Sequence, residues 1–172
     1  MKNRIAAALA ASLFVAGIGI GYAAQKVAPQ VFHGKSKEDA ARALLDVARM
    51  QAGDGSWERI AIGRVLYLGG HKAEGQTVFD AMLAGKHEDS DEFRIARIYR
   101  EAGEWSKAKP LFDRFVANNP KDEKGLTDIG TYYLLNGDRT TAESLFDRSF
   151  ETLEFWATVS AAGAYLGVPP QE

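Results

Sequence analysis

Arginines recur every third residue in one segment of helical periodicity, at Arg94, Arg97 and Arg100. Residues three apart lie close together on one side of a helix, so these side chains share a surface. Arg64 occupies the position that matches Arg97 in an earlier copy of the same pattern. A guanidinium group binds a carboxylate through two parallel hydrogen bonds. The four arginines predict a basic patch for an acidic segment or a C-terminal carboxylate; the alternative is that they are solvated and pair with the chain's own carboxylates.

The densest acidic stretch, residues 87–92, combines one imidazole with several carboxylates. It lacks the glycine and spacing of a calcium-binding loop, and none of the three histidines has a neighbour at zinc-ligand spacing. Asp89 followed three residues later by Glu92 is typical of a helix start, where acidic side chains cap free N–H groups. We expect a capping box here and no metal site.

Composition excludes several functional classes. The 172 residues include no cysteine, which excludes disulfides, thiol catalysis and a lipid-modified N-terminal Cys. The 21 basic and 23 acidic side chains give a net charge of −2, which argues against nucleic-acid binding. No Gly-x-Ser-x-Gly turn occurs, and the glycine-rich run Gly17–Gly21 has no Lys partner. We expect no enzymatic activity and no cofactor.

The sequence predicts an export segment at residues 1–24, because Lys2 and Arg4 precede the uncharged run 5–24. Small residues at Gly21 and Ala23 fit cleavage of a signal peptide after Ala23 or one residue later. An uncleaved anchor is the alternative, since about 20 residues can cross a bilayer. Either outcome predicts export, to the periplasm or to an anchored position at the inner membrane. Residues 25–35 are expected to form a short tether.

A frame of six residue types recurs three times after the tether: β-branched, small, large apolar, Gly, small and Phe. The copies are Ile62, Gly63, Leu66, Gly70, Gly75 and Phe79; then Ile95, Ala96, Tyr99, Gly103, Ala108 and Phe112; then Ile129, Gly130, Tyr133, Gly137, Ala142 and Phe146. The small residues let two helices approach closely, and glycine ends the first helix because it readily adopts a left-handed conformation. A single such pair cannot bury its apolar face, whereas stacked copies can. The regular spacing also predicts that Phe79, Phe112, Phe146 and the three tryptophans pack in the core, least securely at Trp57.

This pattern resembles the tetratricopeptide repeat family, a 34-residue helix–turn–helix unit. Copies span residues 56–88, 89–122 and 123–156, and the second matches best because Trp105, Phe115 and Pro120 also fall on family positions. Flanking helices are expected at 36–51, with Ser36 as N-cap, and at 155–166. The resemblance implies an all-α, right-handed solenoid of about eight helices over residues 36–168.

In this family the first helix of each repeat lines a concave groove that receives peptides. The resemblance implies these groove positions: Trp57, Ile60, Arg64, Tyr67 and Leu68; Phe93, Arg94, Arg97, Arg100 and Glu101; Lys124, Thr127, Asp128, Thr131 and Leu134. The asparagines of the family's carboxylate clamp are absent. The expected function is a non-catalytic scaffold or adaptor of the cell envelope that binds a protein or peptide. Two alternatives remain: a structural subunit that self-associates through Phe155 and Trp156, and a periplasmic chaperone similar to repeat modules that hold apocytochrome or secretion substrates.

Overall fold

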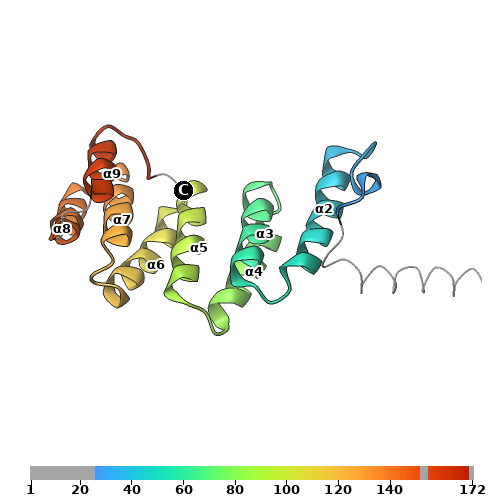
Figure 1. Cartoon of the computed structure of the whole chain (residues 1–172), viewed down its shortest axis with the longest axis horizontal. Helices are drawn as coiled ribbons and strands as arrows, with labels where there is room; N and C mark the ends of the chain where they lie inside the picture. Colours follow the sequence, from blue (N-terminus) through green and yellow to red (C-terminus); the bar gives the residue numbers. More distant parts are fainter. Residues whose placement is uncertain (1–25, 152–154, 171–172) are drawn as a thin grey trace, which may run out of the picture. The chain divides into compact units, whose positions relative to one another are not determined.

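The computed structural model describes residues 26–151 and 155–170, and this part of the chain folds into eight α-helices without strands (Figure 1). After a 3-10 turn, η2 (Pro29–Val31), the helices are α2 (Lys37–Ala52), α3 (Ser56–Leu68), α4 (Lys72–Ala84), α5 (Asp89–Glu101), α6 (Trp105–Asn118), α7 (Glu123–Leu135), α8 (Arg139–Ser149) and α9 (Phe155–Tyr165). The predicted all-α class and helix number are confirmed. The predicted export segment lies outside the described residues. None of the described helices is both long enough and apolar enough to span a membrane.

The chain divides into two compact units, Met1–Val78 and Phe79–Glu172. In the first unit, α2 begins at Ser36, whose hydroxyl accepts from the Asp39 N–H at 3.1 Å, as predicted. Its core joins α2 to α3 and the start of α4 through Ala52, Ile62, Leu66, Leu45, Ala48 and Val78. At Gly75 the helices touch so closely that a Cβ would lie 2.7 Å from the Gly63 carbonyl oxygen.

Identical turns end the first helix of each repeat. Gly70, Gly103 and Gly137 have φ values of 95°, 75° and 90°, which side chains with a Cβ rarely adopt. The next residue in each case donates its N–H to a carbonyl five residues back, at 2.8–3.0 Å, which is the Schellman arrangement. The predicted role of these glycines is therefore confirmed.

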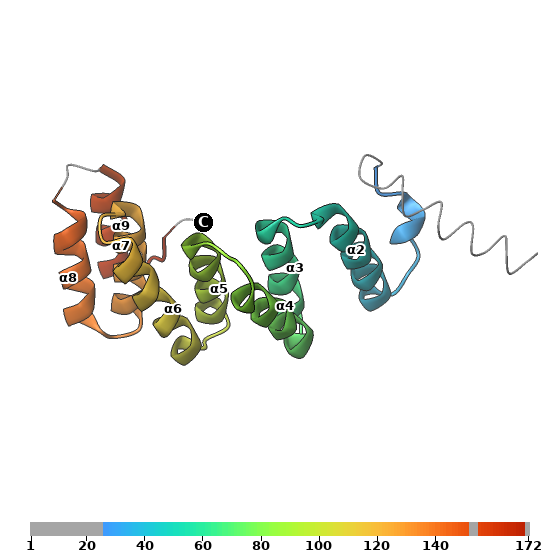
Figure 2. The ribbon, with the colours of Figure 1, turned by 90° about the horizontal axis from the view of Figure 1, so that it is seen from below.

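The second unit consists of the pairs α5/α6 and α7/α8, with α9 packed along α7 (Figures 1 and 2). Its core follows the predicted columns: Ala108, Phe112 and Ala142 are buried, and the Phe112 ring stacks on Tyr132 at 5.2 Å. A Cβ at Gly130 would lie 2.7 Å from the Phe146 ring, so this glycine sets the α7–α8 approach. The core prediction is wrong for Trp57 and Trp156, which are 58% and 70% exposed, because each lies at the start of a helix beyond its packed face.

Candidate partner-binding groove

A hollow of about 200 Å³ lies between α5 and α7. Its lining is Ser90, Phe93, Arg94, Arg97, Phe115, Asp122, Lys124, Gly125 and Asp128. Three of the predicted partner-binding residues, Phe93, Arg94 and Arg97, thus meet at one site. They do so because Phe93 and Arg97 are one helical turn apart on α5 and Arg94 is adjacent.

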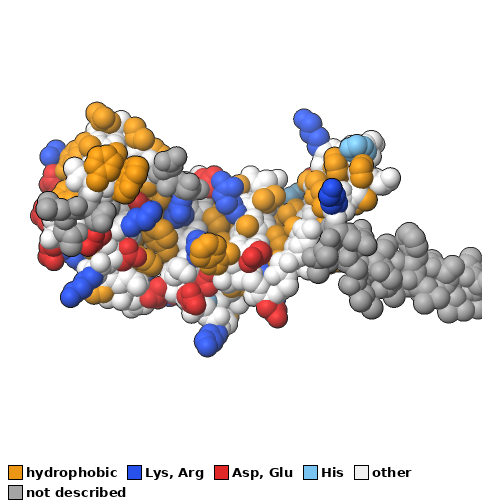
Figure 3. Space-filling model, in the orientation of Figure 1, with side chains coloured by type: hydrophobic (Ala, Val, Ile, Leu, Met, Phe, Trp, Pro, Cys, Tyr) orange, Lys and Arg blue, Asp and Glu red, His pale blue; other side chains and the backbone are white. Residues whose placement is uncertain are grey.

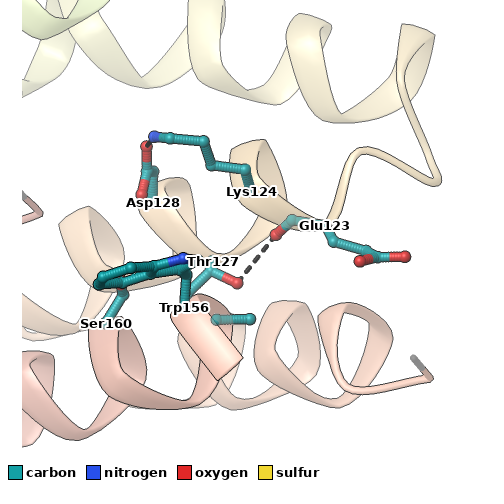
Figure 4. Close-up of a pocket in the computed structure, with 7 residues that line it drawn as sticks. Glu123, Lys124, Thr127, Asp128, Trp156 and Ser160 are labelled. Atoms are coloured by element: carbon teal, nitrogen blue, oxygen red, sulfur yellow. Dashed lines mark hydrogen bonds and ion pairs between the residues drawn. The ribbon is translucent and has the colours of Figure 1, made fainter. Parts of the chain in front are cut away.

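A second hollow, of about 440 Å³, lies between α7 and α9. Figure 4 shows its lining from Glu123, Lys124, Thr127 and Asp128 on α7, and from Trp156 and Ser160 on α9, which Ala157 completes. Lys124 and Asp128 line both hollows, so the two adjoin along α7. We call this continuous surface, from Phe93 to Trp156, the α5–α7–α9 groove.

Charges of both signs face one another in the groove. Asp128 is buried, and its Oδ2 atom accepts from the exposed Lys124 ammonium at 2.5 Å. Burial raises the pKa of Asp128 above its ordinary value, while Lys124 and Arg97 oppose that shift. Asp128 is one of the chain's own carboxylates with which the arginines could pair, and it forms an ion pair with Lys124.

Arg94 and Arg97, the two arginines of the groove, contact other residues of their own helix, α5. Arg94 donates to the Ser90 carbonyl oxygen at 3.0 Å, and its Nη1 atom lies 3.8 Å from the Asp91 carboxylate. Burial lowers the pKa of Arg94, which indicates a guanidinium partly withdrawn from water. Arg97 lies over the Phe93 ring, 5.7 Å from its centroid, in a cation–π contact.

The remaining predicted site residues lie elsewhere. Arg100 stacks on Tyr132 at 4.6 Å and lines a separate hollow of about 200 Å³ with Trp105. Thr131 is fully buried and its hydroxyl donates to the Thr127 carbonyl oxygen. Tyr67 is buried in the first unit and carries the Lys72 ammonium over its ring. Arg64, half-buried, also belongs to that unit, so its place in a patch with the other arginines stays a prediction.

The acidic stretch, residues 87–92, caps the start of α5 and forms a hydrogen bond with α6. The predicted capping box is displaced by one residue: Glu88 is the N-cap, and Asp91 accepts from its N–H at 3.2 Å. The Glu92 carboxylate instead accepts a hydrogen bond from Arg114 on α6 at 2.7 Å, and its Oε1 atom lies 2.9 Å from Nε2 of His87. In the described residues, no cluster of three or more His, Asp or Glu side chains could hold a metal ion.

Sequence reasoning missed the contribution of α9 to this site. Trp156 and Ser160 form one wall of the groove, although the sequence pattern predicted that Trp156 packs in the core. The signal for them is weak, because α9 contains only small, apolar and hydroxyl side chains. The sequence shows that α9 has no charged side chain, but it does not show which face of α9 packs against α7.

Paired antiparallel helices, glycine-ended first helices and a groove along them define a helical-repeat protein. The tetratricopeptide repeat family model matches residues 92–122, which cover α6 and most of α5. Residues 92–122 therefore form a tetratricopeptide repeat, and repeats of this family are protein–protein interaction modules. No curated protein and no solved structure shows a significant match to the chain.

Proposed function

We propose that the α5–α7–α9 groove binds an acidic segment of a partner protein, and that the chain acts as a non-catalytic adaptor of the cell envelope. The observation that carries the proposal is the convergence of Arg94 and Arg97 with Lys124 on one hollow. Two carboxylates, Asp122 and Asp128, line the same hollow, so cations outnumber anions there. Burial disfavours the ionised form of Asp128, which further supports a positive site.

Apolar surface at both ends of the groove suggests a second feature of the ligand. Phe93 is half-buried at one end, and Trp156 is mostly exposed at the other. Aromatic side chains of this kind often dominate the binding energy of protein interfaces. We therefore expect the partner segment to carry an apolar side chain beside its acidic residues.

A peptide titration tests this function. The probe is a fluorescent peptide with a central run of Asp and Glu and one flanking Leu, and its Asn/Gln counterpart is the neutral control. Arg97→Ala should weaken binding of the acidic peptide roughly tenfold, equivalent to about 1.4 kcal/mol. Arg148→Ala is the matched control, because Arg148 is on α8 and binds the Pro120 carbonyl oxygen outside the groove lining. Equal affinities for both variants would exclude the groove as the binding site.

The envelope location rests on the apolar run 5–24 and is tested separately. We expect the full chain in the envelope fraction of the cells that produce it. Its intact mass there distinguishes cleavage after Ala23 or Ala24 from a retained anchor. A full-length chain in the cytosolic fraction would contradict the proposal while leaving groove binding untouched.

A further inference from the structure

Residues 166–172 follow α9 and are called the α9 extension. Its described part, residues 166–170, leads from α9 toward α5 (Figures 1 and 2). Gly167, with a φ value of 80°, ends α9, and the Val168 N–H donates to the Gly163 carbonyl oxygen at 2.9 Å. Pro169 and Pro170 have fixed φ angles, and each favours an extended backbone for the residue before it. The turn at Gly167 therefore sets the direction of the extension, and a stiff backbone keeps it.

The α9 extension returns to the surface of the second unit at Pro170. Pro170 is partly buried, whereas Val168 is 55% exposed and Pro169 is also exposed. Residues 171 and 172 lie outside the described residues, and two residues span at most roughly 7 Å. Their attachment to Pro170 therefore restricts them to the surface beside it.

Two arginine side chains of α5 lie where that helix meets α7. Arg97 lines the hollow between the two helices, and Arg100 stacks on Tyr132 of α7 at 4.6 Å. Figure 3 shows Lys and Arg side chains on the surface between the positions that α5 and α7 have in Figure 1. No carboxylate in the described part of the chain forms an ion pair with the half-buried Arg100. This surface therefore suits a further carboxylate.

The α9 extension supplies a carboxylate of its own. Glu172 is the only charged residue after Glu154 in the sequence, and it follows an apolar stretch that contains Val168 and two prolines. The extension thus has the composition expected of the ligand of the groove, an acidic residue beside apolar side chains. Guanidinium groups bind a carboxylate through charge-assisted hydrogen bonds. Charge complementarity therefore favours Glu172 as an occupant of the surface that Pro170 approaches.

We propose that residues 171–172 dock where α5 meets α7, with the Glu172 carboxylate between the guanidinium groups of Arg97 and Arg100, and that this docking closes the groove until a partner displaces it. The competition rests on the proposed function, because Glu172 and the acidic segment of the partner bind the same Arg97. The apparent affinity for a partner falls in proportion to the fraction of chains whose groove is open. The α9 extension thus regulates the groove by excluding weak acidic ligands.

A spin label on the α9 extension tests the docking in the absence of any partner. Gln171→Cys in the full chain, in mild detergent, provides a single labelling site because the sequence has no cysteine. We expect a motionally restricted nitroxide spectrum for this chain, and a mobile one when Glu172→Gln or Arg100→Ala is added. Arg148→Ala is the matched control, because Arg148 lies on α8 and binds the Pro120 carbonyl oxygen, and it should leave the label restricted. A mobile label in the starting chain, or one that either substitution leaves restricted, would overturn the proposal.

Titration of the unlabelled full chain with the acidic peptide separates the docking from the proposed function. Glu172→Gln should bind this peptide about fivefold more tightly than wild type, which corresponds to docking in roughly four chains of five. Arg100→Ala should also tighten binding, whereas Arg97→Ala should weaken it. An acidic peptide that binds wild type and Glu172→Gln equally would overturn the regulation and leave groove binding intact. A restricted label in a chain that binds no acidic peptide would refute the proposed function and support the docking of Glu172.

Discussion

Helices α7 and α9 pack along each other, yet α7 is buried over most of its length and α9 on one face only. All nine residues from Gly125 to Tyr133 are buried, whereas α9 buries only Ala157, Ala161 and Ala164. α7 carries the charged residues Glu123, Lys124 and Asp128, whereas α9 has no charged residue at all. A helix that is apolar all round is normally buried. The difference shows that α9 keeps apolar side chains in contact with solvent, among them Phe155, Trp156 and Val159, whereas α7 buries its apolar side chains in the core.

The largest expected effect comes from enlarging the small residue in each helix. Gly130→Leu forces a side chain into the Phe146 ring, where even a Cβ would lie at 2.7 Å. We expect the free energy of unfolding to fall by about 3 kcal/mol, the upper end of typical overpacking costs. Ala162→Leu, at an exposed position on α9, should change it by less than about 0.5 kcal/mol. Urea denaturation at low protein concentration measures both, and equal losses would show that α9 is covered as α7 is.

Ala108→Leu applies the same strain to the α5/α6 pair. Ala108 is fully buried, so overpacking should cost roughly 1–3 kcal/mol of unfolding free energy. Ala117→Leu on the same helix is the control, because Ala117 is exposed. A neutral result for Ala108→Leu would mean that the repeat register is wrong.

The two tyrosine contacts should differ in proportion to their burial. Tyr133→Phe removes a hydrogen bond from a buried side chain and should cost about 1 kcal/mol. Tyr165→Phe removes the same bond from a side chain that is 51% exposed, and water can replace it, so the cost should be smaller. Thermal unfolding of the two variants ranks them; a larger loss for Tyr165→Phe would contradict the claim that burial sets the cost of losing each hydrogen bond.

Alkaline pH probes the Tyr133 hydroxyl separately. Burial and the Asp113 carboxylate raise the pKa of Tyr133 to about 12, from an ordinary value of about 10. The unfolded chain therefore loses this proton first as the pH rises. The stability contributed by Tyr133 is fully present below about pH 10 and is lost progressively towards pH 12. Stability measured over this range should fall more steeply for wild type than for Tyr133→Phe; parallel curves would refute the shift.

Much of the fold could be predicted from the sequence because its rules are local. Gly70, Gly103 and Gly137 ended their helices as expected, since a left-handed residue leaves few alternatives to glycine. The capping box before α5 was misplaced by one residue, because Glu92 forms its bonds with His87 and Arg114 rather than with its own helix start. Such a competition between partners depends on tertiary contacts.

The groove could be predicted only in part. Phe93, Arg94 and Arg97 lie together because helical spacing alone places them on one face of α5. Thr131 is buried, since α7 is enclosed by its neighbours, and Trp156 lines the groove because α9 packs along α7. Neither placement follows from periodicity within one helix.

Peptide titration of two variants tests the central claim most directly, namely that the α5–α7–α9 groove selects an acidic ligand by charge. Arg97→Ala and Asp128→Asn change the charge of the same hollow in opposite directions. Titration with the acidic peptide should show weaker binding to Arg97→Ala and tighter binding to Asp128→Asn, whereas the neutral peptide should distinguish neither variant from wild type. Changes of the same sign in both variants, or equal changes with both peptides, would contradict the account.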